Sequence, residues 1–125
     1  MLRHSARVTM TASVLHDEGL ALLALRGKLD VAVTSLVQSA VDGVLADGLL
    51  LLVVDLTGLA CCDSTGLGTL IRASRRMSEA GGSCVVAGAH GPVARLLQLM
   101  ATSQVLTQTE DVGTALVRLR AIADA

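Results

Sequence analysis

The chain has 125 residues, a formal net charge of −1 and 52% hydrophobic residues, but no phenylalanine, tyrosine or tryptophan. A chain of this length forms one domain with its own core, and this hydrophobic content excludes an intrinsically disordered protein. The missing aromatic rings and the missing excess of positive charge argue against nucleic-acid binding, because bases stack on aromatic side chains and phosphates attract basic residues.

Membrane and export signals are not expected from the sequence. No apolar stretch approaches the roughly 20 residues that cross a bilayer. The N-terminal residues MLRHSARVTM contain no apolar segment of the kind found in signal peptides. Three cysteines, without a CxxC pair, do not fit a secreted disulfide framework. We therefore expect a cytoplasmic protein.

The first third of the chain predicts a hairpin and a helix. Residues 7–14 alternate between apolar and polar, which is typical of a half-exposed strand at a sheet edge. A turn at 16–19 leads to a second, almost wholly apolar strand over 20–26. Asp30 is then a suitable N-cap for a helix that ends near Ala46. Its apolar stripe consists of Val33, Leu36, Val37, Ala40, Val41, Val44 and Leu45.

The remaining elements alternate between strand and helix. A buried strand over Leu49–Leu56 leads through a short loop to a helix from about Thr65 to Ala80. A strand is expected over 84–87, followed by a helix that starts at 91 with proline in its first turn. A short strand is expected around 104–107, and a last helix starts near 110. In these three helices the residues expected to be buried are Leu67, Leu70, Ile71, Ser74 and Met77, then Val93, Leu96, Leu97 and Met100, then Val112, Leu116, Leu119 and Ile122.

This order of elements predicts one compact α/β domain. We expect a mixed, mostly parallel sheet of about four to five strands, with an N-terminal hairpin and about four helices packed on it. Connections between parallel neighbours should be right-handed.

Ser64 follows the predicted buried strand and stands at the start of the next helix. Its role has two interpretations. It is either a helix N-cap, whose hydroxyl accepts a hydrogen bond from the N–H of Gly66 or Leu67, or a site of phosphate chemistry. Unpaired N–H groups and the positive end of a helix dipole favour an anion at this position. Gly66 and Gly68 favour the second interpretation. Glycine in the first turn costs about 1 kcal/mol relative to alanine, and it leaves the backbone open to a large group.

The hexapeptide DSTGLG at 63–68, between an apolar strand and an amphipathic helix, resembles the signature of bacterial anti-sigma factor antagonists. These are single-domain members of the STAS family (sulphate transporter and anti-sigma antagonist). Gly27-Lys28-Leu29-Asp30 resembles the family's Gly-acidic-apolar-Asp element, with Lys28 in the acidic position. Gly81-Gly82 before the next strand also fits. The resemblance covers nearly the whole chain and implies a STAS domain over 1–125.

This resemblance implies a partner-switching regulator of transcription. Such an antagonist binds an anti-sigma factor that is also a serine kinase, and thereby frees a sigma factor. Ser64 is then the phosphoacceptor, ahead of Thr65; phosphorylation ends the binding and a phosphatase restores it. Lys28 leaves open which kinase is preferred. The implied partner-binding residues are Asp30, Asp63, Ser64, Thr65, Gly66, Leu67 and Gly68.

The same resemblance implies that the protein is a kinase substrate and no enzyme. ATP would be bound by the partner, so we expect no cofactor, no metal and no direct contact with nucleic acid or membrane. The chain also has neither a GxSxG nucleophile elbow nor a P-loop. The alternative is a STAS interaction module of a larger signalling or transport assembly, in which Ser64 only caps a helix.

Two further groups of residues have open roles. Cys61 and Cys62 precede the Ser64 loop and Cys84 opens the next strand, so oxidation there would disturb the loop; buried, inert thiols are the other interpretation. Zinc would also need His16 or His90 at suitable distances. The arginines of the second helix form either a solvated face or part of a docking surface; they are Arg72, Arg75 and Arg76.

Overall fold

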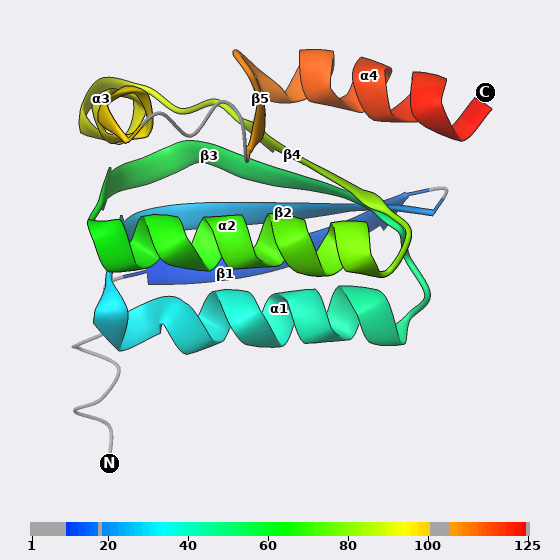
Figure 1. The fold of residues 1–125 in the computed structure, drawn as a ribbon, viewed down its shortest axis with the longest axis horizontal. Helices are drawn as coiled ribbons and strands as arrows, with labels where there is room; N and C mark the ends of the chain where they lie inside the picture. The colour runs from blue at the N-terminus through cyan, green and yellow to red at the C-terminus, as the bar shows by residue number, and fades with distance from the viewer. Residues whose placement is uncertain (1–9, 18, 101–105, 125) are drawn as a thin grey trace.

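The computed structural model describes residues 10–17, 19–100 and 106–124. Within these ranges a five-stranded sheet and four α-helices alternate along the chain (Figure 1). The strands are β1 (Met10–Asp17), β2 (Leu20–Leu29), β3 (Leu51–Cys62), β4 (Ser83–Ala87) and β5 (Thr107–Thr109). The helices are α1 (Thr34–Ala46), α2 (Ser64–Glu79), α3 (Gly91–Leu99) and α4 (Val112–Asp124), and a 3₁₀ turn, η2 (Val31–Val33), precedes α1.

The strands lie in the sheet in chain order, β1-β2-β3-β4-β5. β1 pairs with β2 in antiparallel orientation, and each later pair is parallel. This confirms the predicted mixed sheet with an N-terminal hairpin, and it places β1 at the edge. Among the described helices, none is long and apolar enough to cross a membrane.

Helices cover both faces of the sheet. Figure 1 shows α1 and α2 side by side along one face and α4 on the opposite face. Successive side chains of a strand point to opposite faces of the sheet. β2 and β3 therefore contribute side chains to two cores, one on each face. On the α1–α2 side the buried strand residues include Leu23, Leu25, Leu52 and Val54. The α4 side contains Leu20, Val53, Val85, Ala87, Ala115 and Leu119. Because β3 is buried on both faces, its sequence is a continuous apolar run.

Three side chains that were expected in the core are exposed. Leu36 is 40% exposed, Met100 53% and Ile122 48%. Leu36 and Ile122 lie at the margin of the apolar stripe of their helix, and Met100 is the C-cap residue that follows α3. In α2, Ile71 and Ser74 are only half-buried, while Ala73 is buried in line with Leu67, Leu70 and Met77.

Strand boundaries differ from the sequence prediction at several ends. β3 continues to Cys62 instead of ending at Leu56, and β2 continues to Leu29. Two β-bulges explain the missed extension, because the extra residues on β3 break the alternation that marks a strand. Residues 16 and 17 belong to β1 instead of the turn. The short strand expected around 104–107 is at Thr107–Thr109. Residues 7–9 and 104–105 lie outside the described residues.

Candidate functional site

The site is built where β2 and β3 end together. Leu29 is in register with Cys62, and the N–H of Asp63 donates to the carbonyl oxygen of Leu29 at 3.3 Å. Because the two strands are parallel, the residues that follow them lie at the same end of the sheet. The structure therefore brings Asp30 and the Asp63–Ser64 loop next to each other, although they are far apart in sequence.

Asp63, and not Ser64, caps α2. Asp63 has an extended backbone (φ −95°, ψ −178°), and its Oδ1 accepts a hydrogen bond from the N–H of Gly66 at 2.8 Å. Its carbonyl oxygen accepts the first helical hydrogen bond, from the N–H of Leu67 at 2.9 Å. Ser64 is the first residue of the helix and is exposed. Its hydroxyl has no hydrogen-bond partner among the described residues. The interpretation of Ser64 as the cap is therefore wrong.

Gly66 is required by packing inside the protein. A Cβ atom at this position would lie 2.4 Å from the carbonyl oxygen of Leu29, 2.8 Å from the Cγ of Leu29 and 3.0 Å from the Sγ of Cys62. Glycine thus lets the first turn of α2 approach the end of β2. The expectation that Gly66 leaves the backbone open to a large group is wrong, because Gly66 is buried. At Gly68 the backbone is open as expected, because a Cβ there would meet no atom within 4 Å.

Asp30 is the cap that the sequence predicted, although the helix begins with the 3₁₀ turn η2. Its side chain accepts a hydrogen bond from the N–H of Ala32 at 3.0 Å. The next residue, Val31, is 70% exposed. This exposed apolar side chain, next in sequence to Asp30, was not predicted because the expected apolar stripe of the helix begins only at Val33.

The seven residues expected to bind a partner divide into accessible and supporting ones. Asp63, Ser64 and Thr65 are exposed, and Asp30 and Gly68 are half-buried. Leu67 is only 2% exposed and packs in the core. With the buried Gly66, Leu67 therefore supports the surface and does not form it.

The arginines of α2 have two different environments. Arg72 and Arg75 are exposed. Arg76 reaches α1, where its guanidinium donates to Asp42 at 2.5 Å and to the side-chain oxygen of Gln38 at 3.4 Å. Arg76 thus joins the two helices whose N-terminal ends carry Asp30 and Ser64, a role that the sequence alone did not indicate.

The three cysteines are free thiols. The thiol of Cys62 donates to the carbonyl oxygen of Asp63 at 3.4 Å, directly below the loop. Burial, and then the nearby Asp63 and Cys61, raise the pKa of Cys62 to about 11. Burial raises the pKa of Cys84 to about 12. Both thiols are protonated at neutral pH and hence weak nucleophiles. Over 10–17, 19–100 and 106–124, no three His, Cys, Asp or Glu side chains group as metal ligands.

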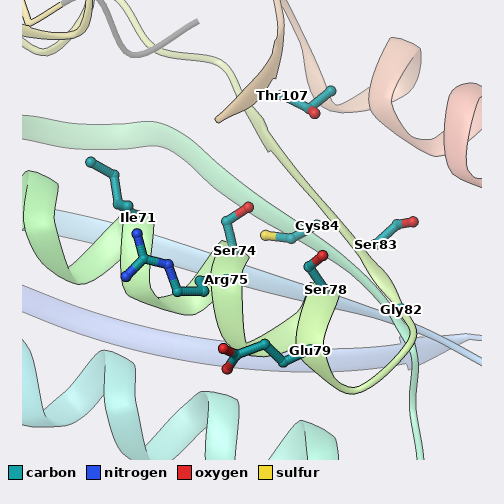
Figure 2. A pocket seen from close by; sticks show the side chains of 9 residues that line it. All are labelled: Ile71, Ser74, Arg75, Ser78, Glu79, Gly82, Ser83, Cys84 and Thr107. Carbon is teal, nitrogen blue, oxygen red and sulfur yellow. The ribbon is translucent and has the colours of Figure 1, made fainter. Parts of the chain in front are cut away.

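A cavity of about 400 Å³ lies between the second half of α2 and the start of β4 (Figure 2). The hydroxyls of Ser74 and Ser78 point toward Cys84, while Arg75 and Glu79 extend along the outer side of the helix. This cavity explains why Ser74 is half-buried instead of packed in the core. It lies along α2 away from Ser64, so it does not form part of the loop site.

Comparisons with known proteins give a family and a fold. The family model described as the STAS domain matches residues 11–115. A search of curated protein sequences gives no match. Among solved structures, the chain is similar to an anti-sigma factor antagonist from Mycobacterium paratuberculosis, with a TM-score of 0.79 and 24% identity over 89% of this chain and 94% of that one.

Two other solved structures are nearly as similar. A serine-to-glutamate variant of RsbS from Moorella thermoacetica has a TM-score of 0.78 and 21% identity over 91% of this chain and 98% of that one. A sulfate transporter family protein from Wolinella succinogenes has a TM-score of 0.77 and 13% identity over 89% of this chain and 93% of that one. At these identities the structures establish the shared fold, and the family match covers most of the sequence. The chain belongs to the STAS domain family.

Proposed function

We propose that this protein is an anti-sigma factor antagonist that is switched off by phosphorylation of Ser64. The observation that carries the proposal is that Asp63, and not Ser64, caps the start of α2. Asp63 supplies the cap, and the exposed Ser64 hydroxyl makes no hydrogen bond to any residue that the structure describes. A kinase can then use this hydroxyl without breaking a contact on which the fold depends.

The start of α2 is suited to carry a phosphoryl group. Phosphorylation adds roughly −1.5 to −2 charges at neutral pH. At a helix N-terminus the dipole favours such a charge, typically by about 0.3–1 kcal/mol. The N–H of Gly66 is already paired with Asp63, but the positive end of the helix remains. The domain can therefore accept the phosphate without refolding.

The same charge would oppose a docked partner. Asp30 and Asp63 already place two carboxylates at this sheet edge, and a phosphoryl dianion on Ser64 would add to them. In a desolvated interface, a penalty of about 3 kcal/mol would weaken binding more than a hundredfold, since about 1.4 kcal/mol corresponds to a factor of ten. A local change of charge is therefore sufficient to switch partners.

The proposed partners follow from this role. The unmodified protein binds an anti-sigma factor serine kinase and releases its sigma factor, and a serine phosphatase acts on the phosphorylated form. ATP is bound by the kinase, and this chain catalyses no reaction of its own. The role would place the protein in the cytoplasm, where sigma factors act.

Binding assays with the cognate kinase test the switch. The kinase is first identified by screening the anti-sigma factor serine kinases encoded in the same genome. Ser64→Ala should bind it as tightly as the unmodified protein, whereas Ser64→Asp should bind at least about tenfold more weakly. Ser78→Asp is the matched control, because it adds the same charge at an exposed serine near the other end of α2, and it should bind as tightly as the unmodified protein. Equal affinities of Ser64→Asp and Ser64→Ala would contradict the proposal.

A second function is favoured by one comparison, the similarity of fold to the sulfate transporter family protein. In that case the chain is an interaction module of a transport or signalling assembly, and Ser64 is not modified. Affinity purification separates the two: recovery of an integral membrane protein, without a serine kinase, would support the module.

A further inference from the structure

A second polar hollow lies on the sheet face that carries α4. Strand alternation places Leu20, Leu22 and Ala24 on this face, and Asp55 lies in register with Ala24 on one side and Ala87 on the other. α4 lies over the start of these strands (Figure 1). Its Ala115 and Leu119 share a buried cluster with Leu20 and Val53. Further along, a hollow of about 380 Å³ is lined by Ala24, Leu25, Arg26, Asp55, Thr57 and Gly58.

Asp55 is a half-buried carboxylate with spare hydrogen-bonding capacity. Its Oδ1 accepts a hydrogen bond from the N–H of Thr57 at 2.9 Å. Throughout the described part of the chain, no cation forms an ion pair with Asp55, and no group donates to its second oxygen. An acceptor of this kind, held in the middle of a sheet face, is available to a ligand.

Arg26 supplies the opposite charge from the neighbouring strand. It is in register with Gly58, and a Cβ at Gly58 would lie 2.9 Å from the Cγ and 3.3 Å from the Nε of Arg26. The arginine side chain thus lies across β3 at Gly58, where no Cβ stands in its way. Arg26 has no ion pair with any residue that the structure describes, Asp55 included. One hollow therefore holds a cation and a carboxylate that do not neutralise each other.

Thr57, which lines the hollow beside Asp55, is held in place by the loop after β4. Gly88 has a φ of +83°, and a Cβ there would lie 2.4 Å from the Oγ1 of Thr57. A ring nitrogen of His90, Nε2, is 2.8 Å from the carbonyl oxygen of Thr57. The β-bulge of β3 falls between Asp55 and Gly58, and bulges commonly redirect side chains at binding sites. These contacts hold the Asp55–Thr57 segment of β3 in place before any ligand arrives.

We propose that this hollow binds a free α-amino acid, with its ammonium group on Asp55 and its carboxylate on Arg26. A zwitterion satisfies both unpaired charges at once, through charge-assisted hydrogen bonds. The volume falls within the range of about 300–1,000 Å³ of small-molecule sites. The position, toward the carboxyl ends of parallel strands, is where open α/β sheets bind ligands. The residues that line the hollow include neither Ser64 nor its neighbours in the loop.

Titration of the isotope-labelled protein with each free L-amino acid, followed by NMR, tests the proposal. At least one should cause saturable shifts of the amides of Arg26, Asp55, Thr57 and Gly58. For the tightest ligand, the N-acetyl and the carboxamide derivatives each lack one charge and should bind about tenfold more weakly or worse. No saturable binding by any amino acid, or derivatives that bind as tightly as the parent amino acid, would overturn the proposal.

Two variants assign the charges to their residues. Asp55→Asn keeps an oxygen that can accept from the N–H of Thr57, and Arg26→Gln keeps much of the side-chain length. Each should weaken binding about tenfold or more, whereas Arg72→Gln, at an exposed arginine of α2, should leave it unchanged. Unchanged affinity in either Asp55→Asn or Arg26→Gln would contradict binding of a zwitterion.

Discussion

The carboxylate of Asp63 accepts a hydrogen bond from the N–H of Gly66 at 2.8 Å, and this bond closes the first turn of α2 around Ser64. It fixes the start of the helix at the edge of the sheet, while the Ser64 hydroxyl stays exposed. Asp63 thus stabilises the helix and Ser64 carries the proposed modification. Mutation of each residue can therefore test the two roles separately.

Replacement of the cap should destabilise the protein, and replacement of the serine should not. Asp63→Ala should lower the free energy of unfolding by about 0.5–2 kcal/mol, the usual cost of losing an N-cap. Ser64→Ala should change it by less than about 0.5 kcal/mol, as expected for an exposed side chain that does not cap the helix. Urea denaturation measures both. Asp63→Asn is the control, because it retains the acceptor oxygen; a larger loss in Ser64→Ala than in Asp63→Ala would contradict the assignment.

Two glycines of α2 should respond to alanine in opposite directions. Gly66→Ala places a methyl group 2.4 Å from the carbonyl oxygen of Leu29, and the backbone shift it forces should cost about 1–3 kcal/mol. Gly68→Ala meets no atom within 4 Å and should stabilise the helix by up to about 1 kcal/mol. Thermal unfolding of the two variants gives the comparison. If both variants unfolded at the same temperature, the close packing of Gly66 would be refuted.

The ion pair between Arg76 and Asp42 should contribute little to stability. The side chain of Asp42 is 64% exposed, and such pairs contribute about 0.2–1 kcal/mol. A double-mutant cycle with Arg76→Gln and Asp42→Asn should give a coupling energy in this range. The coupling should fall at high salt because solvent ions screen exposed charges. A coupling that salt does not reduce would show that the pair is not screened by solvent.

Stability should decline at alkaline pH through the buried thiol of Cys84. The pKa of Cys84 is raised from 9.0 to about 12, so this group stabilises the folded state fully below pH 9.0. Above that pH the unfolded chain loses the proton first, and the contribution disappears as the pH approaches the folded value. Urea unfolding between about pH 8 and about pH 11 measures the decline. Cys84→Ala should decline less steeply; an identical pH dependence would be inconsistent with this contribution.

The order of elements could be predicted from the sequence because periodicity records burial. The alternation that identifies β1 as an edge strand and the apolar run of β3 both follow from how many faces each strand buries. The end of β3 could not be predicted in this way. Its two bulges place extra residues between Asp55 and Cys61, and a period-two pattern does not survive such insertions.

At the candidate site, the start of a helix near Ser64 could be predicted from the sequence, but the structural role of each residue could not. Asp63 and Ser64 are both good N-caps, and a shift of one residue in the helix start decides between them. The local sequence indicates open backbone at Gly66, whereas the reason for this glycine is the carbonyl group of Leu29, which is distant in sequence. The hollow at Arg26 and Asp55 depends on strand register, so no local pattern revealed it.

Phosphorylation mapping tests the central proposal most directly. The protein is incubated with ATP and its cognate anti-sigma factor serine kinase, and its peptides are then analysed by mass spectrometry. We predict a single phosphoryl group on Ser64, no incorporation in Ser64→Ala, and normal incorporation in Thr65→Ala. A kinase that binds the protein tightly but leaves Ser64 unmodified, or that phosphorylates Thr65 instead, would contradict the proposed switch.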